Sequence, residues 1–158
     1  MGGRDGNLAS RGLAWALVQI PVLVVAAYLP AATGRWPDDD PLVSFLGAAL
    51  MISGLGIVIV AALRLGRSLT PLPVPKPDAT LQVGGLYRMV RHPIYAGAVM
   101  AVLGWSLWWC SWPGVLWTFV VFSFFDRKAA YEERWLLARF PDYQQYQSRT
   151  AKFFPFVY

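Results

Sequence analysis

Two segments of this sequence carry the side chains most suited to binding a small polar ligand. Arg91 and His92 directly precede Pro93, and Glu132 and Glu133 stand together about forty residues later. Proline favours the first turn of a helix, so a helix is expected to begin near Pro93, where free backbone N–H groups attract anions. A carboxylate instead suits a cationic group. The two segments therefore offer opposite charges to one ligand if the fold brings them together.

Simpler explanations exist for the same residues. Glu132 can pair with Lys128, four residues earlier, on a solvated helix face, a contact worth only a few tenths of a kcal/mol. On local sequence alone this explanation is favoured. Adjacent helical residues point about 100° apart, so at most one of the two glutamates is expected to face a given pocket. His92 is the only histidine and Cys110 the only cysteine, which argues against a metal site and excludes an internal disulfide.

The elements that must position these residues are strongly apolar. Of 158 residues, 56% are hydrophobic and 15% charged, too apolar a balance for a soluble domain of this size. A helix needs about 20 residues to cross a hydrocarbon core of about 30 Å. Four uncharged runs approach that length, at 13–32, 42–63, 94–109 and 113–125. We predict a single all-α domain, 1–158, that forms an integral membrane bundle of about four transmembrane helices. In the second run, Gly47, Gly54 and Gly56 would allow close helix approach.

The last two runs are separated by a short turn and predict a helical hairpin. The second of them continues past residue 125 without Gly or Pro as far as Arg139, and Pro141 should end it. A helix from Pro113 to Arg139 would be about 40 Å long, more than the hydrocarbon core. The part that carries the two glutamates should therefore project from the membrane and return to the vicinity of His92.

The distribution of basic residues predicts the orientation. If successive loops are assigned alternately to the two membrane faces, all basic residues except Arg35 lie on one face. Arg35 lies on the opposite face, in the same loop as the acidic run 38–40. Basic loops are typically cytoplasmic, so both termini and the segments 64–92 and 126–158 are expected on that side. No basic stripe with interleaved aromatic residues favours nucleic-acid binding. The first run could also be a signal peptide, but it is longer than the usual apolar core of about 7 to 15 residues.

The sequence resembles the isoprenylcysteine carboxyl methyltransferase and phospholipid methyltransferase superfamily in four motifs that follow the family order. They are Gly85-Leu86-Tyr87-Arg88, Arg91-His92-Pro93-Ile94-Tyr95-Ala96-Gly97, Glu132-Glu133, and the tail with Tyr143, Tyr146 and Lys152-Phe153-Phe154-Pro155. The likeness covers roughly residues 70 to 158, and Lys152 stands where the family usually has arginine. It implies methyl transfer from S-adenosylmethionine at the cytoplasmic membrane boundary, with S-adenosylhomocysteine as product. The sequence has no Gly-x-Gly-x-x-Gly motif that follows a strand, and this absence is consistent with the resemblance.

The resemblance also implies a cofactor site in the segments 64–92 and 126–158. Its predicted residues are Gln82, Val83, Tyr87, Val90, Arg91, His92, Pro93, Tyr95, Gly97, Glu132 and Glu133. One of the two glutamates would bind the α-amino group of the donor, and its carboxylate would meet Arg91, Arg88 or the helix start at Pro93. Gln82, Val83 and Val90 would enclose the adenosine. No metal is expected.

The predicted catalytic residues are Arg91, Arg127 and Tyr131. Either arginine could orient an anionic acceptor through paired N–H donors, and Tyr131 is one of few candidate bases. A carboxylate acceptor is already ionised at neutral pH and needs no base, unlike an amine or thiol. We therefore expect a lipophilic carboxylate that enters from the membrane lipids. The alternative is a non-enzymatic membrane scaffold or transporter component; the sequence identifies no protein partner.

Overall fold

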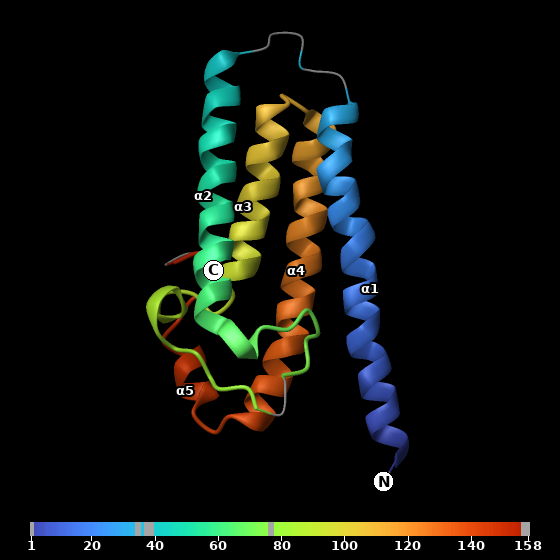
Figure 1. Ribbon diagram of the computed structural model, residues 1–158, viewed down its shortest axis with the longest axis vertical. Coiled ribbons are helices and arrows are strands. Elements are labelled where there is room, and N and C mark those ends of the chain that lie inside the picture. The colour runs from blue at the N-terminus through green and yellow to red at the C-terminus, as the bar shows by residue number, and fades with distance from the viewer. Residues whose placement is uncertain (1, 34–35, 37–39, 76–77, 156–158) are drawn as a thin grey trace.

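The computed structural model of the chain describes residues 2–33, 36, 40–75 and 78–155, the first ten of these for their backbone alone. Its elements are, in order, α1 (Gly2–Ala32), α2 (Pro41–Leu65), the 3-10 turns η1 (Gly66–Ser68) and η2 (Gly85–Arg88), α3 (Pro93–Trp108), α4 (Trp112–Arg139) and α5 (Tyr143–Gln147). The four long helices lie side by side along the long axis of the molecule (Figure 1). The described residues form no β-strand, so the prediction of an all-α fold is confirmed.

Local sequence explains most helix ends. Asp40 caps α2 by accepting a hydrogen bond from the Leu42 N–H at 2.8 Å, and Ser111 caps α4 in the same way for Gly114 at 3.1 Å. Helix α3 begins at Pro93, and α4 continues unbroken to Arg139, both as expected. Helix α1 begins at Gly2, well before the predicted residue 13, because an apolar run marks where a helix meets lipid and not where its backbone starts.

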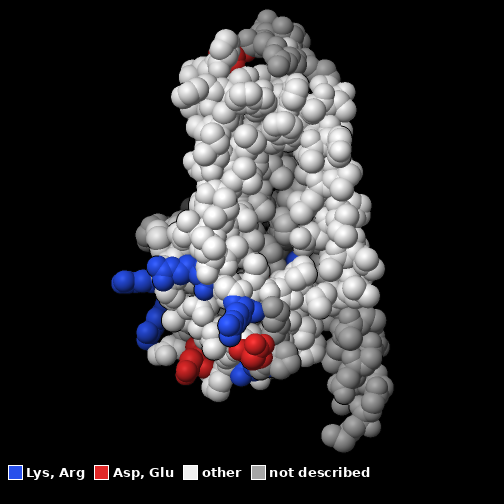
Figure 2. All heavy atoms as spheres, in the orientation of Figure 1, with Lys and Arg blue, Asp and Glu red and all other residues white. Residues whose placement is uncertain are grey.

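Two helices are long and apolar enough to cross a membrane, namely the part Gly12–Ala32 of α1 and the segment Pro41–Ser68. Only 11% and 17% of their most apolar windows are buried within the fold, unlike the core helices of soluble proteins. Side chains such as Phe45 and Leu63 are 69% and 76% exposed. On the face in Figure 2, charged side chains gather at one end, below a broad band without them. These surfaces fit a lipid environment.

The other two predicted crossings differ from this pair. Helix α3 has 16 residues and is about 24 Å long, whereas α4 has 28 residues and is about 42 Å long. By length alone α3 is short for a hydrocarbon core of about 30 Å, and α4 is long enough to leave it. That all four helices cross the bilayer therefore stays a prediction.

Glycine contacts hold α2 tightly against α3. A Cβ atom on Gly54 would lie 2.5 Å from the Gly97 carbonyl oxygen, and one on Gly97 would lie 2.6 Å from the Gly54 oxygen. Gly47 meets the Trp108 backbone nitrogen in the same way at 2.5 Å. The expectation for Gly56 is wrong, because a Cβ there would meet nothing within 4 Å. The small residues fix the position of α3, whose first turn carries the candidate site.

The segment between α2 and α3 gathers with α5 at one end of the bundle (Figure 1). There the tail pairs with the residues that precede α3: the N–H groups of Arg91 and His92 donate to the carbonyls of Ala151 and Lys152 at 2.9 and 3.1 Å. Lys152 also forms an ion pair with Asp126 of α4. The tail thereby ties the start of α3 to the lower half of α4.

Candidate functional site

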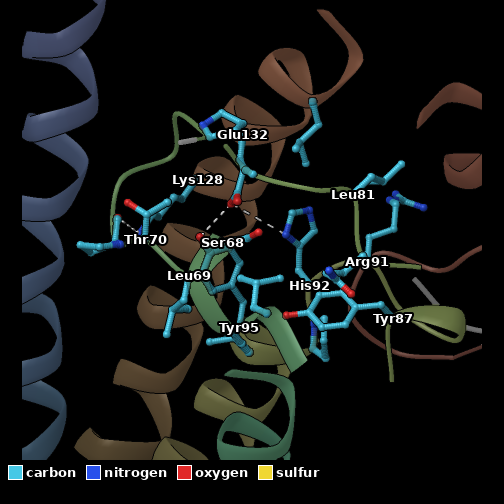
Figure 3. A pocket seen from close by; sticks show the side chains of 18 of the residues that line it. Ser68, Leu69, Thr70, Leu81, Tyr87, Arg91, His92, Tyr95, Lys128 and Glu132 are labelled. Atoms are coloured by element: carbon cyan, nitrogen blue, oxygen red, sulfur yellow. Dashed lines mark hydrogen bonds and ion pairs between the residues drawn. The ribbon is translucent and has the colours of Figure 1, made fainter. Parts of the chain in front are cut away.

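The start of α3 and the lower half of α4 converge, as the sequence analysis required. The Tyr95 hydroxyl donates to Oε2 of Glu132 at 2.9 Å, and Nδ1 of His92 lies 4.0 Å from the same oxygen. The rings of His92 and Tyr95 stack with centroids 5.4 Å apart. Figure 3 shows these three side chains turned toward one another in one pocket. Residues forty positions apart thus form one polar cluster.

Glu133 belongs to the same cluster but is already saturated with partners. Its Oε1 accepts from Nε of Arg91 at 2.8 Å and lies 3.1 Å from Nε2 of His92, and its Oε2 accepts from Nε2 of Gln147 at 2.9 Å. Burial alone would raise the pKa of the Glu133 carboxyl, but the hydrogen bonds and charges of His92 and Arg91 outweigh it and lower the pKa to about 2. Glu133 is therefore an ionised structural anchor.

A cavity of about 460 Å³ opens in front of this cluster. This volume falls within the range of about 300–1,000 Å³ typical of small-molecule sites. The walls come from α1, α2, α3, α4, α5 and the segment that joins α2 to α3. The predicted cofactor residues in the wall are Gln82, Tyr87, Arg91, His92, Pro93, Tyr95 and Glu132. Seven predicted residues, widely spaced in the sequence, thus share one cavity.

The remaining four predicted cofactor residues do not line the cavity. Val83 is 49% exposed, and Val90 is buried in the backbone pairing with Ala151. Gly97 packs against α2, and Glu133 lies behind the wall in the cluster described above. That these four contact the cofactor therefore stays a prediction.

Arg127 and Tyr131, two of the predicted catalytic residues, point to a different side of α4. They line a second, more open hollow with Trp15, Ala130 and Arg134. Arg127 is exposed. The structure does not bring these two side chains together with Arg91, the third predicted catalytic residue, because the helix rotation that turns Glu132 into the cavity turns them away.

Lys128 is a cavity residue that sequence reasoning missed. It is 2% exposed, and its ammonium group donates to the side-chain oxygen of Gln19 and to the Pro71 carbonyl at 2.9 Å. The expected solvated pair with Glu132 is therefore wrong. Burial lowers the pKa of Lys128, and the negative charge of Glu132 opposes that effect. Figure 3 shows Lys128 beside Glu132.

A spacing signal for Lys128 was present in the sequence. The cavity-facing residues of α4 are Phe125, Lys128, Glu132 and Leu136, which follow each other at intervals of three or four. That is the spacing of one helix face. Gln19 had no comparable signal, because its place in the wall depends on how α1 packs against α4.

Three tyrosines complete the wall. The Tyr146 hydroxyl donates to the Tyr87 carbonyl at 2.6 Å, whereas the hydroxyl of Tyr143, a side chain 1% exposed, has no hydrogen-bond partner among the described residues. Such an orphaned group is available to a ligand. Burial raises the pKa of Tyr146 to about 12 and the pKa values of Tyr87 and Tyr143 further still. All three hydroxyls are therefore protonated at neutral pH.

Comparison with known proteins agrees with this geometry. The sequence pattern of the phospholipid methyltransferase family matches residues 42–142. A probable protein-S-isoprenylcysteine O-methyltransferase of Oryza sativa subsp. indica is 29% identical over 149 residues, 92% of this chain and 75% of that protein. Protein-S-isoprenylcysteine O-methyltransferase A of Arabidopsis thaliana is 33% identical over 119 residues, 73% of this chain and 60% of that protein.

A solved structure extends the likeness to the fold. The eukaryotic intramembrane Ras methyltransferase, isoprenylcysteine carboxyl methyltransferase, superposes with a TM-score of 0.68 at 22% identity, over 99% of this chain. The chain spans about half of that protein, 53% of its length. This chain has two apolar helices that expose most of their surface. Together with these relatives, the two helices indicate an integral membrane protein. Because the family pattern covers more than half of the chain, the protein belongs to the phospholipid methyltransferase family, within the superfamily that its motifs resemble.

Proposed function

We propose that this protein transfers a methyl group from S-adenosylmethionine to a lipophilic acceptor at the membrane surface. The observation that carries the proposal is the cavity in which Glu132 lies beside His92 and Tyr95, at the end of the bundle where charged side chains gather. The named activities of the relatives support the reaction class. By the positive-inside tendency we place this end of the molecule in the cytosol.

The cavity residues fit the donor. Glu133 is already paired with Arg91 and lies within hydrogen-bond distance of His92, so Glu132 is the carboxylate left for the α-amino group of the donor. The first turn of α3 lines the cavity at Pro93, and its positive end suits the carboxylate of the donor. The orphaned Tyr143 hydroxyl offers a further hydrogen bond. Of the two glutamates that the sequence left as alternatives, we therefore assign Glu132.

The donor, when bound, supplies an electrophilic methyl group. The task of the protein is then to align the acceptor with that methyl and to exclude water, which the largely apolar walls favour. The wall tyrosines are protonated at neutral pH and are poor bases, since the pKa of Tyr146 is raised to about 12. An acceptor that ionises on its own fits such a site, which favours a carboxylate over an amine or thiol.

The apolar part of the cavity wall indicates where the acceptor lies. Leu23, Val58, Ala98 and Phe125 line it, one from each of the four long helices. The wall thus reaches from the polar cluster into the part of the bundle that faces lipid. A hydrocarbon chain can lie there with its head group near the cluster.

Ligand binding tests the proposal directly. Purified protein in detergent should gain thermal stability with S-adenosylhomocysteine, by about 2.7 kcal/mol at a concentration 100 times the Kd. Glu132→Gln should weaken the binding about 10- to 100-fold, because one charge-assisted contact is lost. The matched control is Asp142→Asn, which removes an exposed carboxylate from the same end of the chain. A scaffold or transporter component would show no response, and absence of binding at millimolar ligand would refute the methyltransferase assignment.

A further inference from the structure

Lys128 is a buried charged residue of this cavity to which the proposed donor site assigns no contact. Its side chain lines the cavity, is 2% exposed, and is tied to the neutral oxygens of Gln19 and Pro71. No ion pair joins it to a carboxylate within the part of the chain that the structure describes. The negative charge of Glu132 acts on Lys128 without forming an ion pair with it. Once the amino group of the donor pairs with Glu132, the buried cation of Lys128 is stabilised by a second anion in the cavity.

We propose that Lys128 binds the anionic head group of the acceptor, so that the protein selects lipids that carry a carboxylate. The inference rests on the proposed methyl transfer and specifies its acceptor. Lys128 is then a specificity-determining residue that touches substrate, a role that the sequence analysis had given to Arg91 or Arg127.

Two opposite charges, Lys128 and Glu132, lie beside each other in the cavity wall. Lys128 lies over the Tyr95 ring, 5.4 Å from its centroid, while the hydroxyl of the same Tyr95 donates to Glu132. A cationic amino group is attracted to Glu132 and repelled by Lys128, and a carboxylate experiences the reverse. The two charges therefore place the amino group of the donor and the carboxylate of the acceptor at neighbouring positions in one cavity, and each charge repels the wrong group.

The neighbours of Lys128 support an acceptor rather than a donor. Its partner Gln19 comes from α1, one turn from Leu23 in the apolar wall, and Phe125 precedes it by one turn on α4. A carboxylate at Lys128 can thus have its hydrocarbon chain directly on the apolar wall.

The test compares two probes that differ only in charge, N-acetyl-S-farnesylcysteine and its neutral carboxamide. Their binding to the full chain in one detergent is measured with and without saturating S-adenosylhomocysteine. Wild-type protein should bind the carboxylate about 10- to 100-fold more tightly than the amide. Lys128→Met should abolish this preference without weakening the binding of S-adenosylhomocysteine, because it removes a contact to the acceptor carboxylate and no contact to the amino group of the donor.

Two further variants are the controls. Lys128→Arg keeps the charge and should keep the preference, and Arg134→Met removes an exposed positive charge from the same helix and should not change it. Equal wild-type affinity for the two probes overturns the proposal, even if Lys128→Met does not fold. A preference for the carboxylate that survives in Lys128→Met also overturns the proposal. The proposal is likewise overturned if Lys128→Met loses as much affinity for S-adenosylhomocysteine as for the carboxylate, because that result would place Lys128 in the donor site. If S-adenosylhomocysteine does not bind wild-type protein, the methyl transfer proposal fails, while the probe pair still decides the assignment of Lys128.

Discussion

Replacement of Glu133 by glutamine should destabilise the protein strongly and make its stability depend less on pH in the acidic range. In the folded chain the pKa of this carboxyl is about 2 instead of 4.5, the net result of burial and of the stronger effect of His92 and Arg91. At about 1.4 kcal/mol per pH unit, that difference corresponds to about 3 kcal/mol of stability at neutral pH. Glutamine would also leave the guanidinium of Arg91, a side chain 11% exposed, without its counter-charge.

The sign of the pH dependence follows from the lowered pKa. A group whose folded pKa lies below its unfolded value stabilises the protein fully above the unfolded pKa. The contribution of Glu133 should therefore be complete above about pH 5 and be lost as the pH falls from there toward 2. Glutamine does not titrate, so the stability difference between wild type and Glu133→Gln should shrink over the same range.

Thermal unfolding monitored by tryptophan fluorescence measures this difference, since the chain has eight tryptophans. At pH 7 the expected loss in Tm is about 6 to 12 °C, from about 2 to 4 °C per kcal/mol for a chain of this size. Asp142→Asn is the control, because Asp142 is exposed. Equal Tm values for wild type and Glu133→Gln at pH 7, or a gap between them that does not change down to pH 3, would refute the assignment of Glu133 as a buried ionised anchor.

Two further predictions test neighbouring parts of the structure. Tyr95→Phe removes the hydrogen bond of 2.9 Å to Glu132 and should weaken S-adenosylhomocysteine binding about 3- to 10-fold with little change in Tm, measured by calorimetry; unchanged affinity would contradict the proposed donor contact. Gly54→Ala places a Cβ 2.5 Å from the Gly97 carbonyl oxygen and should cost about 1–3 kcal/mol, whereas Gly56→Ala meets nothing within 4 Å and should not destabilise. Equal Tm values for these two glycine variants would refute the close packing of α2 on α3.

The sequence by itself determined the features that depend on local composition. Apolar runs predict the helices because a helix in lipid needs a nearly uncharged stretch of sufficient length. Pro93 and Pro141 mark where α3 begins and where α4 must have ended, because proline has no N–H and a fixed backbone angle. The motifs around His92 and the two glutamates were enough to identify the family.

The tertiary structure decided which side chains face the cavity, because that depends on the rotation of each helix about its axis, and packing sets this rotation. Glycine contacts fix α3 on α2, and the tail fixes the start of α3 against α4. In that arrangement Glu132 and Lys128 face the cavity, Glu133 lies behind it, and Arg127 points elsewhere. Neighbouring residues of one helix point about 100° apart, so a rotation of that size would exchange their roles without any change in the sequence.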